Sequence, residues 1–259
     1  MFGFRQPESP FNPFNPFNPF NPFNPFNPFF TATHFPHPMQ NSDLFLTLLI
    51  LATCGISAVG FSNRLFFQRY QFHVGAILRA KQYERLITSG FLHADWTHLL
   101  FNMLTLYFFH EIILVLYGPI WFFALYFGAL LASNLFSLLL YRNRPSYAAI
   151  GASGAVSGIL FASIAIAPEM MIRFLFIPID IPAWLFATGY FAYSVYMMLN
   201  PRPHDNIGHA AHLGGAVFGF AFVIAMTPQL LAANGLYIGI MSLPLLYMGF
   251  ELFLNKKRR

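Results

Sequence analysis

Two short segments combine glycines with a side chain that can react. In Gly-Ala-Ser-Gly (151–154) a serine lies at the expected start of a helix, where backbone N–H groups have no helical partner. Such N–H groups can stabilise a negatively charged oxygen, so Ser153 is a candidate nucleophile. Ala-His-Leu-Gly-Gly (211–215) supplies His212 as a candidate general base. The alternative interpretation of both segments is close packing without chemistry.

A third segment carries two groups that can donate hydrogen bonds to a developing charge. His98 and Asn102 are four residues apart and therefore share one face of a helix. Together they predict an oxyanion-binding site, although packing is the competing interpretation. We interpret His93 as a brace for the preceding loop. His209 is interpreted as an interfacial or supporting histidine rather than the base.

The histidines of this chain could instead bind a metal ion. His110-Glu111 begins the His-Glu-x-x-His pattern of zinc proteases, but the fifth position is Leu114. His209 and His212 lack the further residues of a clear ligand set. We therefore expect no metal and no cofactor.

The composition indicates an all-α polytopic membrane protein. Of the 259 residues, 57% are hydrophobic and 9% are charged, whereas a soluble domain carries about 25% charged residues. The net charge of +5 comes from scattered cations, apart from the basic residues 256–259. A phosphate-binding surface would need clustered cations, so the expected partner is the lipid bilayer and not nucleic acid.

Seven apolar runs can cross a membrane, since a crossing takes about 20 helical residues. The longest connection, 63–98, is rich in charge and is expected to hold short helices at the membrane interface. The spans are expected near residues 44–62, 99–117, 119–141, 151–167, 181–199, 208–227 and 236–254.

Small residues recur at four-residue spacing in two of these spans. Gly154 and Gly158 lie in the fourth, and Gly215 and Gly219 lie in the sixth. This spacing lets helix backbones approach closely. We expect the two helices to pack directly on each other, which matters because each begins with a reactive side chain.

The first 43 residues form a separate region, since residues 12–29 are six tandem copies of Asn-Pro-Phe. Proline at every third position blocks regular helix or sheet, so the region 1–43 is predicted to be a disordered tail. Asn-Pro-Phe looks like the peptide that eukaryotic EH domains bind, and an EH-domain protein is a candidate partner. The alternative is a low-complexity repeat without a binding role.

The three motifs occur in order on the second, fourth and sixth spans, and this set resembles the rhomboid intramembrane proteases. The stretch 84–93 also looks like that family's first loop, with Arg85 matching its Trp-Arg element. The resemblance covers about residues 44–227 and implies a rhomboid-like six-helix catalytic core with a water-filled cavity. Residues 228–259 would add a seventh transmembrane helix and a basic C-terminus.

By motif match, the resemblance implies a serine endopeptidase that cuts peptide bonds in or near transmembrane segments. Ser153 would be the nucleophile and His212 the base. His98, Asn102 and the Ser153 N–H would hold the oxyanion, and no third, carboxylate member is expected. The implied substrates are single-pass membrane proteins with small or helix-breaking residues near the cut.

Two positions depart from the family pattern. Ser157 stands where the family often has an aromatic residue stacked on the catalytic histidine, and Tyr83-Glu84 replaces the tryptophan before the loop arginine. Two alternative functions stay open. One is an inactive relative that binds membrane proteins, and the other is a transporter with Glu111 and the intramembrane histidines on a proton path.

The positive-inside rule and the family resemblance predict opposite orientations in the membrane. With seven spans, the face bearing the 63–98 loop holds 12 of the 14 lysines and arginines, and Arg5 and Arg173 lie on the other. The positive-inside rule would place that loop in the cytoplasm, whereas the resemblance places it outside, and we follow the resemblance. The expected location is a membrane, which in a bacterium would be the cell membrane.

Overall fold

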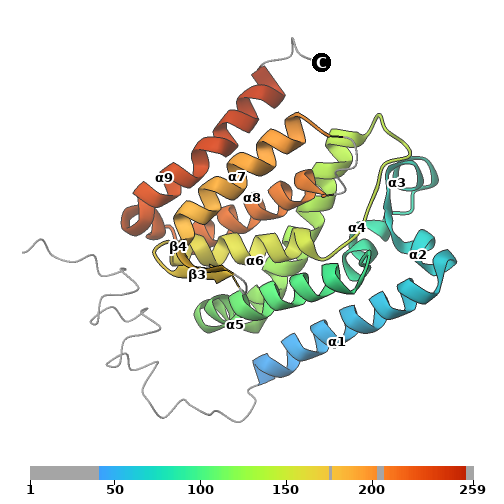
Figure 1. Cartoon of the computed structure of the whole chain (residues 1–259), viewed down its shortest axis with the longest axis horizontal. Coiled ribbons are helices and arrows are strands. Elements are labelled where there is room, and N and C mark those ends of the chain that lie inside the picture. Colours follow the sequence, from blue (N-terminus) through green and yellow to red (C-terminus); the bar gives the residue numbers. More distant parts are fainter. Residues whose placement is uncertain (1–40, 175–176, 203–206, 255–259) are drawn as a thin grey trace, which may run out of the picture.

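The computed structural model describes residues 41–174, 177–202 and 207–254. The Asn-Pro-Phe repeats, and with them the prediction of a disordered tail, lie outside the described residues. The described chain is a bundle of apolar helices with two small antiparallel strand pairs (Figure 1). The long elements are α1 (Asn41–Ser62), α5 (Trp96–Tyr141), α6 (Ser153–Ile166), α7 (Ala183–Leu199), α8 (His209–Met226) and α9 (Leu230–Gly249), which continues as a π-helix over Phe250–Leu254.

The seven predicted spans correspond to these helices, because α5 is two spans in one. At Gly118 the backbone is non-helical, with φ of 77°, and Pro119 follows, so the helix breaks there. By length and apolar composition α1, α5, α8 and α9 can each cross a membrane. The outer helices expose many large apolar side chains, as lipid-facing surfaces do. The expected all-α polytopic class is confirmed, with six core helices and a seventh at the C-terminal end.

Helix α6 lies at the centre of the bundle, between α5 and α8. Every residue from 154 to 165 is buried. With 14 residues, α6 is about 21 Å long, shorter than the roughly 30 Å hydrocarbon core of a bilayer. A helix this short cannot reach both surfaces of a bilayer, so at least one of its ends would lie below a membrane surface.

The predicted close approach of the glycine-bearing helices is confirmed. A Cβ atom at Gly215 would overlap the carbonyl of Gly154, and one at Gly219 would overlap the carbonyl of Gly158. The backbones of α6 and α8 therefore touch without intervening side chains, and their first turns lie side by side. Ser153 opens one of these helices and His212 lies in the first turn of the other.

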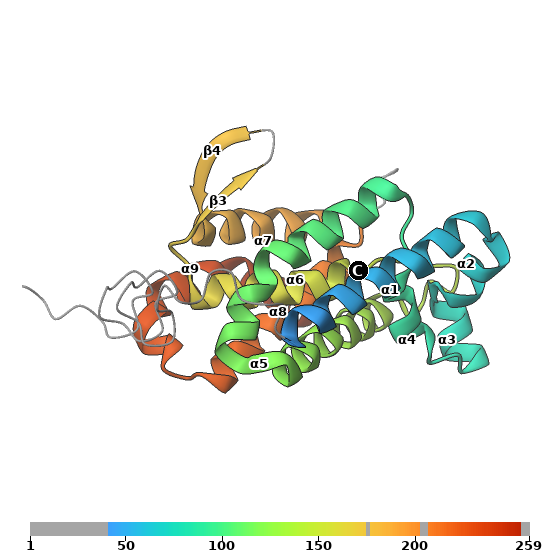
Figure 2. The ribbon, with the colours of Figure 1, turned by 90° about the horizontal axis from the view of Figure 1, so that it is seen from below.

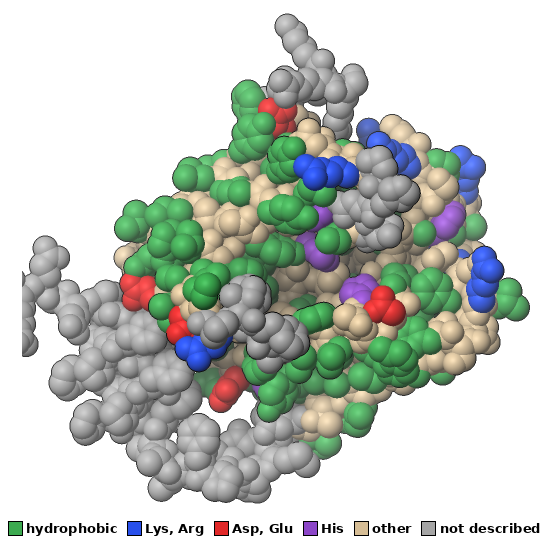
Figure 3. All heavy atoms as spheres, viewed as in Figure 1, with side chains coloured by type: hydrophobic (Ala, Val, Ile, Leu, Met, Phe, Trp, Pro, Cys, Tyr) green, Lys and Arg blue, Asp and Glu red, His purple; other side chains and the backbone are tan. Residues whose placement is uncertain are grey.

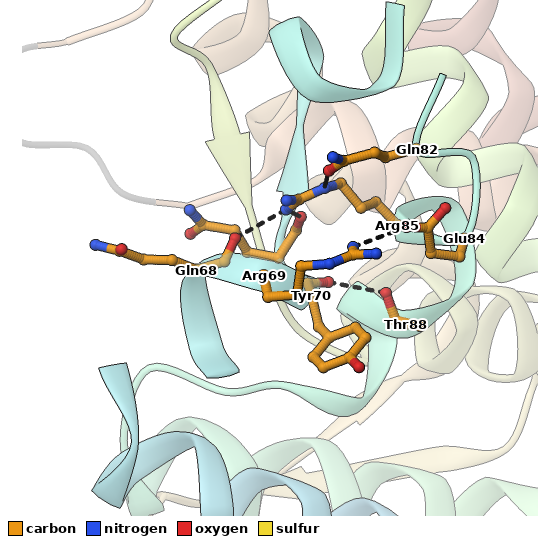
Figure 4. A network of polar contacts seen from close by, with 8 residues as sticks. Gln68, Arg69, Tyr70, Gln82, Glu84, Arg85 and Thr88 are labelled. Carbon is orange, nitrogen blue, oxygen red and sulfur yellow. Dashed lines mark hydrogen bonds and ion pairs between the residues drawn. The ribbon is translucent and has the colours of Figure 1, made fainter. Parts of the chain in front are cut away.

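The 63–98 segment holds short helices, as expected. Arg85 is 6% exposed, and its guanidinium donates to the carbonyls of Gln68 at 2.9 Å and Gln71 at 2.7 Å (Figure 4). Arg69 pairs with Glu84 at 2.7 Å on the surface. These contacts hold the segment together next to the start of α5. Its elements are α2 (Arg64–Tyr70), β1 (Phe72–His73), α3 (Val74–Ala80), α4 (Arg85–Thr88) and a 3₁₀ turn at Ser89–Phe91.

One element was not predicted, the hairpin of β3 (Met171–Phe174) and β4 (Ile177–Pro182) between α6 and α7. It follows the C-terminal end of α6 and projects from the bundle (Figure 2). The prolines at 178 and 182 disfavour helix and the isoleucines favour strand, so the fifth span begins at Ala183 rather than near 181. The other strand pair joins β1 to β2 (Ala148–Ala149) beside the start of α6.

The seventh helix is fastened to the core through the far end of α6. Asn234 in α9 is 5% exposed, and its side-chain amide donates at 3.0 Å to the carbonyls of both Ala165 and Ile166. The last carbonyls of a helix have no partner within the helix, so Asn234 satisfies two of them. The seventh helix thus stabilises α6 from the end opposite Ser153.

Candidate functional site

A sharp turn places Ser153 at the first position of α6. Gly151 has a φ of +117°, which a residue with a side chain rarely adopts. Its N–H donates to the Ser89 carbonyl at 3.0 Å, and the next N–H, of Ala152, donates to His93 Nε2 at 3.3 Å. The turn is therefore held from the segment before α5, and the serine hydroxyl is free to face the cavity.

His93 is fully buried and is a neutral member of a chain of hydrogen bonds. Because its Nε2 accepts from Ala152, its Nδ1 carries the proton and donates to Ser57 Oγ at 2.9 Å. That hydroxyl donates in turn to the Phe91 carbonyl at 2.9 Å. Burial lowers the pKa of His93 to about 3, with a smaller contribution from the nearby His98. This arrangement fits the interpretation of His93 as a brace for the loop.

The structure brings Ser153 and His212 together. His212 lies in the first turn of α8, and its Nε2 is 2.8 Å from Ser153 Oγ. Its other ring nitrogen, Nδ1, is 2.7 Å from the hydroxyl of Tyr190 on α7. The imidazole is thus bonded on one side to the serine and on the other to a tyrosine.

His98 and Asn102 face the same cavity from α5. Nδ1 of His98 accepts a long 3.4 Å hydrogen bond from the Ala94 N–H, which leaves the proton on Nε2. That Nε2 lies beside Gly151, because a Cβ placed on this glycine would be 3.0 Å from it. Asn102 donates one amide hydrogen to the His98 carbonyl at 3.0 Å and retains a second. Both side chains can therefore donate a hydrogen bond toward the space next to Ser153.

These four side chains line one cavity of about 820 Å³. Figure 3 shows this face of the molecule hollowed at its centre, with histidine side chains at the wall of the hollow. Residues of the segment before α5 and of the segment before α8 lie at its rim. A molecule that enters this cavity can therefore reach both Ser153 and His212.

Other polar residues singled out in the sequence lie elsewhere. His209 is buried, with ring contacts to Tyr193 at 5.4 Å and His212 at 6.5 Å, and it is absent from the cavity wall. His110 and Glu111, in the first half of α5, are likewise not part of that wall. Among the described residues, no three His, Cys, Asp or Glu side chains are grouped as a metal site requires.

Sequence reasoning missed one contact of the imidazole, from Tyr190. The signal that could have found it is Ser157, which is 6% exposed and lines the cavity one turn after Ser153. The small side chain at 157 leaves the imidazole without an aromatic neighbour from α6, so a ring from another helix is needed there.

The fold and the site define a class, a multi-pass membrane protein with a hydrogen-bonded serine–histidine pair in a cavity between its helices. A family model described as the Rhomboid domain matches residues 80–229, which is more than half of the chain. The chain belongs to the rhomboid family.

Curated relatives agree with this assignment. RHOMBOID-like protein 12, mitochondrial, of Arabidopsis thaliana is 29% identical over 202 residues, covering 71% of this chain and 58% of that protein. Rhomboid protein 1, mitochondrial, of Saccharomyces cerevisiae is 29% identical over 181 residues, covering 67% and 52%. The human presenilin-associated rhomboid-like protein, mitochondrial, is 32% identical over 148 residues, covering 53% and 36%. The chain thus spans little more than half the length of the first two of these relatives.

Proposed function

We propose that this chain is an intramembrane serine endopeptidase with a Ser153–His212 dyad. The observation that carries the proposal is the 2.8 Å hydrogen bond between Ser153 Oγ and His212 Nε2. A nucleophile that lines a cavity and is bonded to a histidine base is the minimal arrangement for acyl transfer. Membership of a family that includes serine proteases supports it.

In the first half of the reaction, Ser153 Oγ attacks the carbonyl carbon of the scissile peptide bond. His212 Nε2 takes the hydroxyl proton, and the carbonyl oxygen becomes an oxyanion. The Ser153 N–H, His98 Nε2 and the Asn102 amide are the donors proposed to stabilise it. The C–N bond then breaks, His212 gives its proton to the leaving amine, and an ester on Ser153 remains.

In the second half, water in the cavity attacks the ester carbonyl, and His212 takes a proton from it. The same donors stabilise the second oxyanion. Collapse of this intermediate breaks the ester bond, and His212 returns the proton to Ser153 Oγ. The net reaction consumes one water and one peptide bond, and the enzyme is restored.

The depth of the site defines the proposed substrates. Because α6 is too short to reach both surfaces, the scissile bond is cut at or below the membrane surface. A peptide bond within a transmembrane helix is already hydrogen-bonded, so the substrate has to unwind locally before attack. Single-pass membrane proteins with small or helix-breaking residues near the cut meet this requirement.

We also propose a compartment for the protein and a binding partner for its N-terminal repeats. We propose the cell membrane for a bacterial chain, while the names of the relatives favour the mitochondrion for a eukaryotic one. The Asn-Pro-Phe repeats at 12–29 are proposed to bind an EH-domain protein, several weak sites together raising the affinity.

Cleavage of a labelled single-pass membrane protein by the purified full chain in detergent tests the proposed activity. The wild type should release two fragments, and Ser153→Ala should release none while eluting and melting as the wild type does. Ser242→Ala makes the same exchange on α9, away from the cavity, and should cleave normally. Cleavage by Ser153→Ala at the wild-type rate would refute the proposal. A wild type that binds but never cuts its substrates would favour the inactive binder.

A further inference from the structure

The second nitrogen of the His212 imidazole is held by Tyr190. The tyrosine hydroxyl lies 2.7 Å from Nδ1, and the two rings are stacked with 6.3 Å between centroids and 24° between planes. One residue of α7 therefore makes both a polar and a stacking contact with the same imidazole. Neither contact comes from α6 or α8, the helices that carry the dyad.

This hydrogen bond is coupled to the position of the imidazole proton, because Nδ1 donates to Tyr190 in one tautomer and accepts from it in the other. For Nε2 to accept the proton of Ser153, it must present its lone pair, and the ring proton must be on Nδ1. A partly buried N–H at this position needs an acceptor, and the oxygen of Tyr190 is 2.7 Å away. Tyr190 thereby favours the tautomer in which His212 can act as a base, and it fixes the rotation of the ring.

Tyr190 is itself held in place by its neighbours. The rings of Phe161, on α6, and Phe186, on α7, flank it at 5.3 Å and 6.0 Å between centroids. Ser157 lines the same cavity wall as Tyr190. The tyrosine is thus buttressed by aromatic rings, and the small residue at 157 leaves the space that its ring occupies.

We propose that Tyr190 is a positioning residue for His212, the third member of a hydrogen-bonded chain Ser153–His212–Tyr190. The inference rests on the proposed endopeptidase function and deepens it. Tyr190 replaces, from a different helix, the aromatic neighbour that position 157 does not provide. Being neutral, it sets the tautomer and orientation of the imidazole without balancing the positive charge that forms on His212 during the reaction.

The test compares Tyr190→Phe with the wild type and with Tyr196→Phe, all as full chains in detergent. Tyr190→Phe keeps the stacked ring and removes only the hydroxyl. Tyr196→Phe removes a hydroxyl from the same helix at a side chain that is 52% exposed, and it should behave as the wild type. For each protein we measure the rate of labelling by a small fluorophosphonate, kcat and KM for a membrane substrate, and the melting temperature. All rates are measured well below the melting temperatures.

Tyr190→Phe should lower both the labelling rate and kcat about three- to tenfold, the range of one neutral hydrogen bond, with KM unchanged. The small probe needs no substrate groove, so its slower labelling separates an effect on His212 from one on substrate binding. An unchanged labelling rate would overturn the inference, whether or not KM rises. A faster rate would also overturn it, because it would mean that Tyr190 donates to Nδ1 and holds the wrong tautomer.

These outcomes are separable from failure of the proposed function. If the wild type is neither labelled nor able to cleave, the proposed endopeptidase function is wrong. If the wild type is active and Tyr190→Phe is equally active, only the proposed role of Tyr190 is wrong, and the endopeptidase function stands.

Discussion

At the scale of single residues, Asn102 tests how the oxyanion is stabilised. Its amide retains a hydrogen that can point toward the space beside Ser153. Removing one oxyanion donor typically costs about 100- to 1000-fold in turnover, so Asn102→Ala should lose kcat by that order with little change in KM. Asn143→Ala, in an exposed loop, serves as the control. Normal turnover with weakened substrate binding would instead assign Asn102 to substrate positioning.

His93 predicts how stability depends on pH. Its pKa is about 3 in the folded protein, lowered mainly by burial, against 6.5 as the ordinary value. Between these values protons bind preferentially to the unfolded chain, so the stability that a neutral His93 provides is complete above pH 6.5 and declines as the pH falls toward 3. Each pH unit in this window costs at most about 1.4 kcal/mol.

The comparison that isolates this effect is His93→Gln, since glutamine does not titrate but its amide oxygen can accept from Ala152. Melting temperatures in detergent are measured from pH 7.5 down to pH 4.5. The wild type should lose more stability over this range than the variant does. Parallel curves for the two proteins would show that His93 is not the group that titrates.

Most residues of the site could be predicted because they are polar residues inside apolar segments of the sequence. A serine, two histidines and an asparagine in apolar helices are conspicuous, since buried polar groups there are costly. Tyr190 could not be predicted in this way. Aromatic residues make up 19% of the chain, so one more tyrosine carries no signal, and its contact with His212 depends on how α7 packs.

At the scale of elements, the contact between α6 and α8 holds Ser153 next to His212. A methyl group at Gly215 would overlap the Gly154 carbonyl, so Gly215→Ala has to push the helices apart. We expect a loss of about 1–3 kcal/mol in stability and a larger loss of activity, because the dyad distance grows. Thermal melting and substrate cleavage measure the two effects.

Gly239→Ala is the matched control, since a Cβ at Gly239 in α9 would have no other atom within 4 Å. It should melt at or above the wild-type temperature, because alanine favours helix more than glycine does. Equal tolerance of both substitutions would contradict the proposed role of the glycine contact.

The helices were easier to predict than the connections. Long apolar runs locate the spans, and Gly118-Pro119 marks the break in α5 between two of them. The hairpin at 171–182 was missed because a run of isoleucine, phenylalanine and leucine reads equally as strand or helix. Its proline residues were the available signal against helix.

At the scale of the whole molecule, most of the described basic side chains and the cavity lie at the same end of the bundle. The cavity rim includes residues before α5 and α8, and the described lysines and arginines lie mostly toward the end that carries α2 and α3 (Figure 3). The positive-inside rule and the family resemblance therefore disagree about which side of the membrane the mouth of the cavity faces.

The repeat tail should be separable from catalysis, because it precedes every residue of the site. Deleting residues 1–40 should leave kcat and KM in detergent within about twofold of the full chain, since every described residue of the cavity wall is kept. A pull-down with the tail peptide, beside a copy in which each Phe is changed to Ala, tests the EH-domain proposal. Loss of cleavage on deletion would show that the tail contributes to the catalytic unit.

The most direct test of the serine–histidine dyad is to locate the residue that a fluorophosphonate modifies. The purified full chain is labelled in detergent, digested, and the adduct is mapped by mass spectrometry, with His212→Ala and His209→Ala labelled in parallel. The adduct should lie on Ser153 alone. It should be nearly absent in His212→Ala and largely retained in His209→Ala, since His212 is hydrogen-bonded to the serine and His209 is not part of the cavity wall. An adduct on another serine, or labelling of Ser153 at the wild-type rate in His212→Ala, would contradict the dyad.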